Sequence, residues 1–193
     1  MVKGRSSSGP ALVVVFGLVL LLGVNASDQT VKEGQKAHPI EATDADGNRL
    51  SLKQYEGKLV LLDFWASWCP PCREEIPVIK QVYKKYHEQG FEVIGIALDE
   101  DRGDVMTFIK EQEVPWRQVL DTVSFGRKFG NKYGVALIPT AILLGPDGTV
   151  IDTKARGPRL ERLVAKHINS VTNKEPIDIS KAASEKVPPG KVR

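Results

Sequence analysis

Cysteine and histidine are scarce in this chain, and their scarcity argues against a structural zinc site. The 193 residues contain two cysteines, Cys69 and Cys72, and three histidines, none of which lies at a ligand-like spacing from them. A structural zinc site needs four ligands, and no second pair completes one here. Two cysteines one helical turn apart can instead alternate between a dithiol and a disulfide. We therefore favour a redox pair over a metal-binding pair or an inert structural pair.

The body of the chain has no net positive charge. The formal net charge is +3, but Lys3 and Arg5 supply two of these charges and residues 172–193 supply two more. The remaining residues together carry a net charge of about −1. Binding to nucleic acid requires a basic patch or stripe. The charge distribution therefore argues against a nucleic-acid partner.

The longest apolar run is short for a membrane-spanning helix. Residues 11–24 form an uninterrupted run of 14, whereas a spanning helix needs about 20. The run follows Lys3 and Arg5 and precedes small residues, which is the pattern of a secretory signal peptide. We predict that residues 1–26 are a signal peptide or, alternatively, an uncleaved membrane anchor; no cysteine follows the run, which excludes a lipoprotein anchor. The rest of the chain is then expected to work outside the cytoplasm, where disulfides persist.

The two cysteines are expected at a junction between a strand and a helix. The nearly continuous apolar run from Leu59 to Trp65 predicts a buried central strand. An amphipathic helix should follow and end at Gly90, because apolar residues recur at helical spacing: Ile76, Ile79, Val82, Tyr83 and Tyr86. Cys69 would then stand at the helix N-terminus, where the helix dipole favours a thiolate, with Cys72 one turn inside.

Strands and helices alternate along the rest of the chain, which predicts an α/β domain. The expected elements are a hairpin over 40–52, a strand over 91–98, a helix near 103–113, a strand over 116–120, a helix with Phe125, Phe129 and Tyr133 on one face, strands over 141–144 and 149–154, and a helix over 159–169. We place the domain at residues 37–171, after a linker over 27–36. Residues 172–193 lack an apolar period and are expected to be a disordered polar tail.

Several motifs resemble one known family. The segment from Asp63 to Cys72 resembles the active-site segment of the thioredoxin fold, and the continuation to Pro77 is similar to its extracytoplasmic TlpA/ResA-like branch. Farther on, Ile138-Pro139-Thr140 resembles the cis-proline strand of that family. The resemblance spans roughly residues 37–170. It implies a thioredoxin fold, in which helices flank a central mixed sheet, with an N-terminal β-hairpin and a central helical insertion near residues 103–113.

The placement of the cysteines suggests their roles. Cys69 is the expected nucleophile: its thiolate attacks the disulfide of a client, and Cys72 then resolves the mixed disulfide. Pro70 and Pro71 fit the first helical turn, but they remove two N–H groups that could have stabilised the Cys69 thiolate. A less stable thiolate makes the Cys69–Cys72 redox disulfide a more reducing couple.

Two carboxylates are candidates for handling the proton of the dithiol. The resemblance implies that Asp63 is buried beneath the cysteines and that Glu75 is an active-site glutamate. Many relatives have a neutral residue at the position of Asp63, so the share of each acid stays open. Burial raises the pKa of a carboxylic acid, which suits proton transfer near neutrality. The alternative interpretations are a solvated residue at the start of the helix for Glu75 and a hydrogen-bonded buried polar group for Asp63.

The resemblance also implies a surface that binds the client. Pro139 would be a cis proline facing the dithiol, although an ordinary trans proline at a strand edge is the alternative. The backbone of Ile138 would pair with an extended client segment. The complete candidate surface comprises Trp68, Pro70, Pro71, Ile138, Pro139 and Thr140.

We therefore expect a thiol:disulfide oxidoreductase that needs no metal or organic cofactor and acts as a reductase of protein disulfides. In the family it resembles, a membrane electron donor re-reduces the domain, and the clients include apocytochromes awaiting haem attachment. Two alternatives are a thiol peroxidase and a non-catalytic copper chaperone. The first would show a threonine before a lone reactive cysteine, and the second a CxxxC motif with a nearby histidine. The sequence has neither pattern.

Overall fold

The computed structural model describes residues 30–122 and 127–172. The predicted signal peptide or anchor over residues 1–26 lies outside this part of the chain, as do Phe125 and residues 173–193 of the predicted tail. Within the two described ranges, no helix is both long and apolar enough to cross a membrane.

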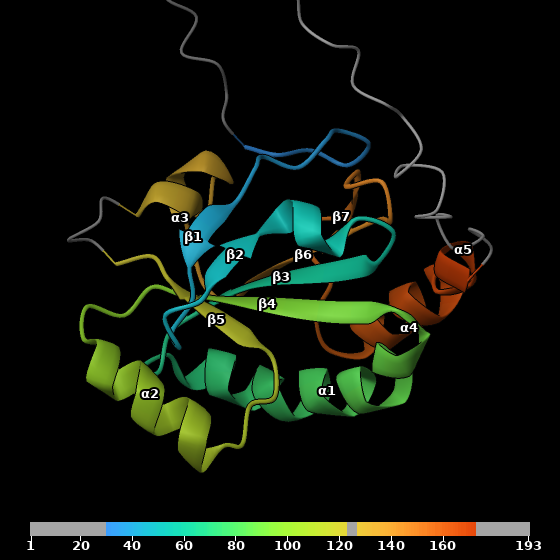
Figure 1. Ribbon diagram of the computed structural model, residues 1–193. Coiled ribbons are helices and arrows are strands. Elements are labelled where there is room, and N and C mark those ends of the chain that lie inside the picture. The colour runs from blue at the N-terminus through green and yellow to red at the C-terminus, as the bar shows by residue number, and fades with distance from the viewer. Residues whose placement is uncertain (1–29, 123–126, 173–193) are drawn as a thin grey trace, which may run out of the picture.

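A five-stranded mixed sheet forms the centre of the domain (Figure 1). The strand order is β5-β4-β3-β6-β7, in which β3, β4 and β5 run parallel and the pairings β3–β6 and β6–β7 are antiparallel. The strands are β3 Leu59–Trp65, β4 Phe91–Ala97, β5 Arg117–Leu120, β6 Thr140–Leu144 and β7 Val150–Asp152. Every residue of β3 is buried, as expected of a central strand that is covered on both faces.

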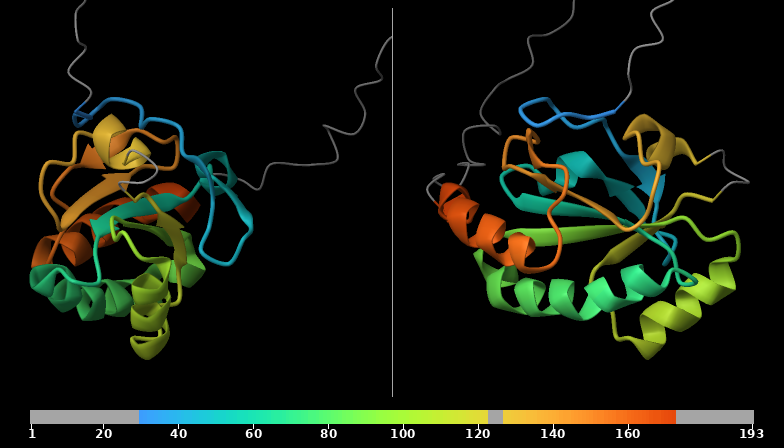
Figure 2. Two further views of the ribbon diagram at one scale, coloured as in Figure 1. Left: turned by 90° about the vertical axis from the view of Figure 1, so that its left-hand side faces the viewer. Right: turned by 180° about the vertical axis from the view of Figure 1, so that it is seen from behind.

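Helices and a hairpin cover opposite faces of this sheet (Figure 2). One face carries α1 Pro70–Tyr86, α2 Arg102–Glu111 and α4 Pro158–His167. The other carries the antiparallel pair β1 Glu41–Thr43 and β2 Arg49–Ser51, the 3-10 turn η1 Leu52–Tyr55, and α3 Lys128–Lys132. Two short helices, η2 His87–Gln89 and α5 Asn169–Thr172, follow α1 and α4. The architecture predicted from the sequence, including the N-terminal hairpin and the inserted helix, is present.

The alternation of side chains along β3 decides which layer each of them meets. Leu61 and Trp65 belong to the core on the α1 side, whereas Leu62 and Phe64 belong to the core on the hairpin side. Successive side chains of a strand point to opposite faces of a sheet. Asp63 therefore points toward α1, the helix that begins beside the cysteines.

The start and the end of α1 follow from local sequence signals. Cys69 is the N-cap residue, and Pro70 and Pro71 occupy the first helical positions, where a missing N–H costs no helix hydrogen bond. Pro77 lies inside the helix. Gly90 closes the following η2 turn with a φ of 96°, a conformation that glycine adopts without steric cost.

Two predicted boundaries differ from the structure. The sequence predicts a linker over residues 27–36, but its described part packs on the domain: Val31 is buried in the core, and the N–H of Gly34 donates to the carbonyl of Val150 at 2.8 Å. A single valine gives no periodic signal, so the sequence does not predict this contact. The last strand is expected over 149–154 but ends at Asp152, whose side chain accepts the N–H of Lys154 at 2.7 Å and turns the chain.

Candidate active site

The two cysteines lie where β3 gives way to α1. A disulfide joins Cys69 to Cys72, with their Cα atoms 5.3 Å apart. Both residues are largely buried, with 4% of Cys69 and 1% of Cys72 exposed. The N–H of Cys72 lies 3.3 Å from the sulfur of Cys69. Although Pro70 and Pro71 have no N–H, one backbone donor therefore still faces the expected nucleophile.

The loop before Cys69 is anchored by a residue that the sequence did not single out for this role. Asp99 follows β4, and 1% of it is exposed. Its two carboxylate oxygens accept the N–H of Ser67 at 3.0 and 3.1 Å, and one of them also accepts the Ser67 hydroxyl. Because β3 and β4 are parallel, their carboxyl ends meet at the same edge of the sheet. An acid directly after the second buried strand was the signal that could have identified Asp99.

Asp63 lies in the interior, on the α1 face of the sheet, and 2% of it is exposed. Burial, aided by the negative charge of Glu75, raises the pKa of Asp63 to about 7, and the positive charge of Arg156 opposes both effects. Its neighbours on the adjacent strands, Gly95 and Ala141, carry no charge. A carboxyl group with this pKa can take up and release a proton near neutral pH.

Glu75 lies one turn after Cys72 on α1 and is held by the loop that leads into α4. One carboxylate oxygen accepts the N–H of Gly157 at 3.0 Å. The other lies 3.8 Å from Nε of Arg156. The Glu75 side chain is 17% exposed, so the structure does not support the interpretation of a freely solvated residue. Its negative charge also acts on Asp63.

The loop before β6 brings the predicted proline to the site. The Ile138–Pro139 peptide bond is cis, as expected from the sequence. Nη1 of Arg156 donates to the carbonyl oxygen of Pro139 at 2.6 Å. The hydroxyl of Thr140 donates to the carbonyl oxygen of Leu137 at 2.6 Å, within the same loop. Like Asp99, Arg156 is a residue of this site that sequence reasoning missed, because a lone arginine in a loop has no pattern that indicates its partners.

Two pockets adjoin the site. Some of the predicted client-binding residues line the first pocket, and the others line the second. The first is lined by Cys69 and by four of these residues, Trp68, Pro70, Pro71 and Ile138, together with Leu98, Arg127 and residues 135–137. The second contains Glu75, Arg156 and the other two predicted residues, Pro139 and Thr140. Leu137 lines both pockets and is 81% exposed, and Trp68, in the first pocket, is 63% exposed. The structure thus brings the cystine and an exposed apolar surface together, with Pro139 and Thr140 in the adjoining pocket.

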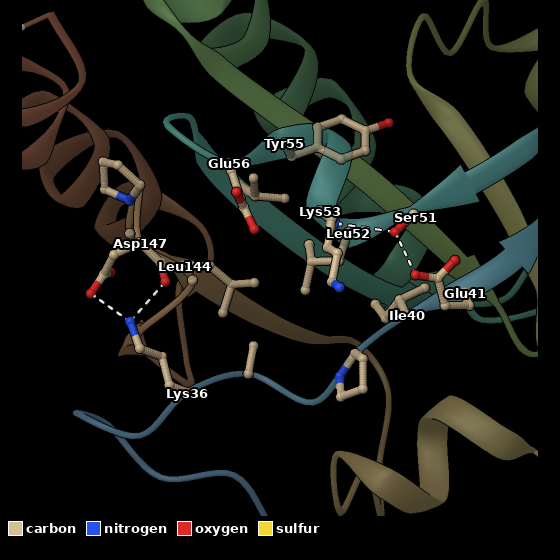
Figure 3. Close-up of a pocket in the computed structure, with 16 residues that line it drawn as sticks. Lys36, Ile40, Glu41, Ser51, Leu52, Lys53, Tyr55, Glu56, Leu144 and Asp147 are labelled. Atoms are coloured by element: carbon tan, nitrogen blue, oxygen red, sulfur yellow. Dashed lines mark hydrogen bonds and ion pairs between the residues drawn. The ribbon is translucent and has the colours of Figure 1, made fainter. Parts of the chain in front are cut away.

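A third pocket lies between the hairpin layer and the turn at residues 145–148 (Figure 3). Nζ of Lys36 lies 2.7 Å from the carboxylate of Asp147 at its rim and holds the pKa of Asp147 well below its usual range. The lining contains neither a cysteine nor Asp63 or Glu75. We assign this pocket no part in the redox chemistry.

Across residues 30–122 and 127–172, no three or more His, Cys, Asp and Glu side chains are grouped so that they could hold a metal ion. The groups of the site that can take part in thiol-disulfide exchange and its proton transfers are the disulfide and the carboxyl groups of Asp63 and Glu75.

Comparisons with known proteins agree with this geometry. The chain matches the Redoxin family over residues 32–166. It is 31% identical over 156 residues to the thiol-disulfide oxidoreductase ResA of Bacillus cereus, an alignment that covers 81% of this chain and 88% of the relative. The structure superimposes on the thioredoxin domain of a thiol-disulfide oxidoreductase from Bacteroides vulgatus with a TM-score of 0.68 and 31% identity, covering 72% of this chain and 100% of that one. A thiol:disulfide interchange protein from Bacteroides sp. gives a TM-score of 0.66 and 32% identity, covering 72% and 91%.

These comparisons confirm the thioredoxin fold and the relationship to ResA that the motifs predicted. The family match covers most of the chain and includes the region of the cystine. The protein therefore belongs to the redoxin family and is an enzyme of thiol-disulfide exchange.

Proposed function

We propose that the protein reduces disulfides in client proteins outside the cytoplasm, with Cys69 as the nucleophile and Cys72 as the resolving thiol. The observation that carries this proposal is the asymmetry of the pair. Cys69 caps α1 and lines a surface pocket beside the exposed Trp68, whereas Cys72 lies one turn inside and is almost fully buried. A client sulfur therefore meets Cys69 first.

The reaction transfers two electrons from the dithiol to the client. The Cys69 thiolate attacks one sulfur of the client disulfide, the client S–S bond breaks, and the departing client sulfur takes the electron pair and a proton. Cys72 then loses its proton and attacks the Cys69 sulfur of the mixed disulfide. The second client sulfur leaves as a thiolate and is protonated, and the Cys69–Cys72 disulfide remains.

The carboxyl pair supplies a place for the proton of Cys72. Asp63 lies beneath the start of α1, and its pKa of about 7 allows it to accept a proton at neutral pH. Glu75 stands one turn beyond Cys72 and lines a second pocket. We assign Asp63 the role of direct acceptor and Glu75 the role of a neighbouring charge that tunes it.

The client surface in this proposal is the pocket around Trp68 and the loop before β6. An extended client segment would pair with the backbone of Ile138, while Trp68, Pro70 and Pro71 provide apolar contact. Thr140 lines the other pocket and bonds the Leu137 carbonyl. In this proposal Thr140 belongs to the client surface, and its hydroxyl also holds the shape of the loop.

The direction of electron flow and the location are part of the same proposal. Pro70 and Pro71 offer Cys69 no N–H, and Asp63 and Glu75, where ionised, place negative charge on the α1 side of the sheet, so the thiolate is weakly stabilised and the couple is reducing. The apolar run over 11–24 supports export or anchoring, and a membrane thiol-disulfide donor would then re-reduce the domain. Apocytochromes awaiting haem attachment are one client class in this proposal. The described residues add no feature that favours a thiol peroxidase or a copper chaperone.

A pair of serine variants tests the roles of the cysteines. Cys69→Ser should abolish turnover with insulin as the disulfide substrate. Cys72→Ser retains the attacking thiol and should accumulate a mixed disulfide, visible on non-reducing gels and released by dithiothreitol. Accumulation of the mixed disulfide in Cys69→Ser instead would reverse the two roles. If neither variant forms one, disulfide exchange does not proceed by this route.

A further inference from the structure

Arg156 lies where three parts of the active site meet. Its Nη1 donates to the carbonyl of Pro139 at 2.6 Å, and its Nε lies 3.8 Å from the carboxylate of Glu75. The adjacent residue, Gly157, donates its N–H to the other oxygen of that carboxylate at 3.0 Å. The loop before α4 therefore binds both the helix of the cysteines and the cis-proline loop.

The guanidinium is also a cation that acts on Asp63. Asp63 is acted on by the negative charge of Glu75 from α1 and by the positive charge of Arg156 from the loop before α4, and its partners on the adjacent strands, Gly95 and Ala141, are uncharged. Nε of Arg156 is buried and has no hydrogen-bond partner within the part of the chain that the structure describes. Its interaction with Glu75 at 3.8 Å is thus electrostatic, and the charge of the arginine acts on the carboxyl pair as a whole.

We propose that Arg156 is the positioning residue that couples client docking to proton transfer in this enzyme. The inference rests on the proposed roles of Cys72 and Asp63. As Cys72 attacks the Cys69 sulfur of the mixed disulfide, its proton passes to the carboxylate of Asp63, its electron pair forms the new S–S bond, and the client sulfur departs with the old bonding pair. Arg156 keeps Asp63 ionised for this step and, through the Pro139 carbonyl, fixes the loop that meets the client.

The two functions of Arg156 can be separated by substitution. Glutamine removes the charge and most of the donor geometry. Lysine keeps the charge, but its single nitrogen cannot contact the Pro139 carbonyl and face Glu75 as the planar guanidinium does. Arg162, which is exposed on α4, provides a matched control for loss of an arginine charge.

The proton step is measured with the reagent 5,5′-dithiobis(2-nitrobenzoate). The first thionitrobenzoate is released when Cys69 attacks the reagent, and the second is released when Cys72 resolves the adduct. Loss of the cation raises the pKa of Asp63, so Arg156→Gln should slow the second release at pH 6 and leave it unchanged at pH 9. A shift of half a unit corresponds to about a threefold loss of ionised Asp63 below its pKa. Arg156→Lys should keep the wild-type pH profile.

The docking step is measured as the KM for reduction of insulin. Both Arg156→Gln and Arg156→Lys should raise it, since neither side chain holds the Pro139 carbonyl as arginine does, while Arg162→Gln should change neither readout. A wild-type pH profile in folded Arg156→Gln overturns the proton part, and an unchanged KM in Arg156→Lys overturns the docking part. If Arg156→Gln does not fold, the test of the proton step rests on Arg156→Lys, which keeps the positive charge. A shifted pH profile in Arg156→Lys would then overturn the proposal that the charge of Arg156 controls the proton step, whereas a wild-type profile supports it. Absence of the second release in the wild-type protein would instead refute the proposed role of Cys72.

Discussion

Replacing Asp63 with asparagine should remove much of the pH dependence of stability. Burial raises the pKa of Asp63 from 3.8 to about 7 in the folded protein. The folded state therefore holds this proton more tightly than the unfolded state does. The resulting stability is fully present below pH 3.8 and is lost as pH rises through about 7. The asparagine side chain stays neutral throughout, so Asp63→Asn should be relatively more stable at alkaline pH.

The magnitude follows from the size of the shift. One pKa unit corresponds to about 1.4 kcal/mol, so three units amount to about 4 kcal/mol for complete ionisation of the buried group. Part of this is already lost at pH 5, where the unfolded state is ionised and the folded state is still protonated. Between pH 5 and pH 9 the wild-type protein should lose about 3 kcal/mol relative to Asp63→Asn.

Urea unfolding of the oxidised protein at these two pH values measures the difference. The quantity to compare is the free energy of unfolding of wild type minus that of the variant. The contributions of the other titrating groups are the same in both proteins and cancel in this difference. Glu74→Gln, an exposed change on the same helix, is the control and should give the same difference from wild type at both pH values. An Asp63→Asn difference that is equal at pH 5 and pH 9 would refute a raised pKa for Asp63, and with it the acceptor role near neutrality.

Two further predictions concern the reduction potential of the Cys69–Cys72 pair and the packing of the core. The reduction potential, measured by equilibration with glutathione buffers, should lie nearer to about −270 mV, the value of thioredoxin, than to about −120 mV, the value of DsbA; a potential above about −180 mV would identify an oxidant or isomerase. Gly95→Ala should destabilise the fold by about 2–4 kcal/mol, because the added Cβ would lie 1.9 Å from Oε1 of Gln118, which accepts the indole N–H of Trp65 at 3.0 Å. Thermal or urea unfolding measures this loss, and a change below about 0.5 kcal/mol would mean that Gln118 moves aside freely.

The central elements could be predicted because their signals are local. An apolar run followed by a helical apolar period placed β3 and α1, and the cysteines necessarily fell between them. The alternation of side chains along β3 even determines on which face of the sheet Asp63 lies. By contrast, Glu75 meets Gly157 across a sequence separation of 82 residues. No spacing rule connects such positions, so the contacts of Arg156 and the anchoring of Ser67 by Asp99 emerged only in three dimensions.

The anchoring of the loop before Cys69 has a consequence for repeated turnover. Asp99 holds Ser67, the Cys69 N–H donates to the Ala66 carbonyl at 3.2 Å, and the Arg73 N–H donates to the Cys69 carbonyl at 3.1 Å. None of these bonds involves a sulfur atom, so opening the disulfide breaks none of them. The reduced and oxidised enzymes can thus share one scaffold, in which only the sulfurs change partners. We therefore expect each catalytic cycle to start with little structural reorganisation.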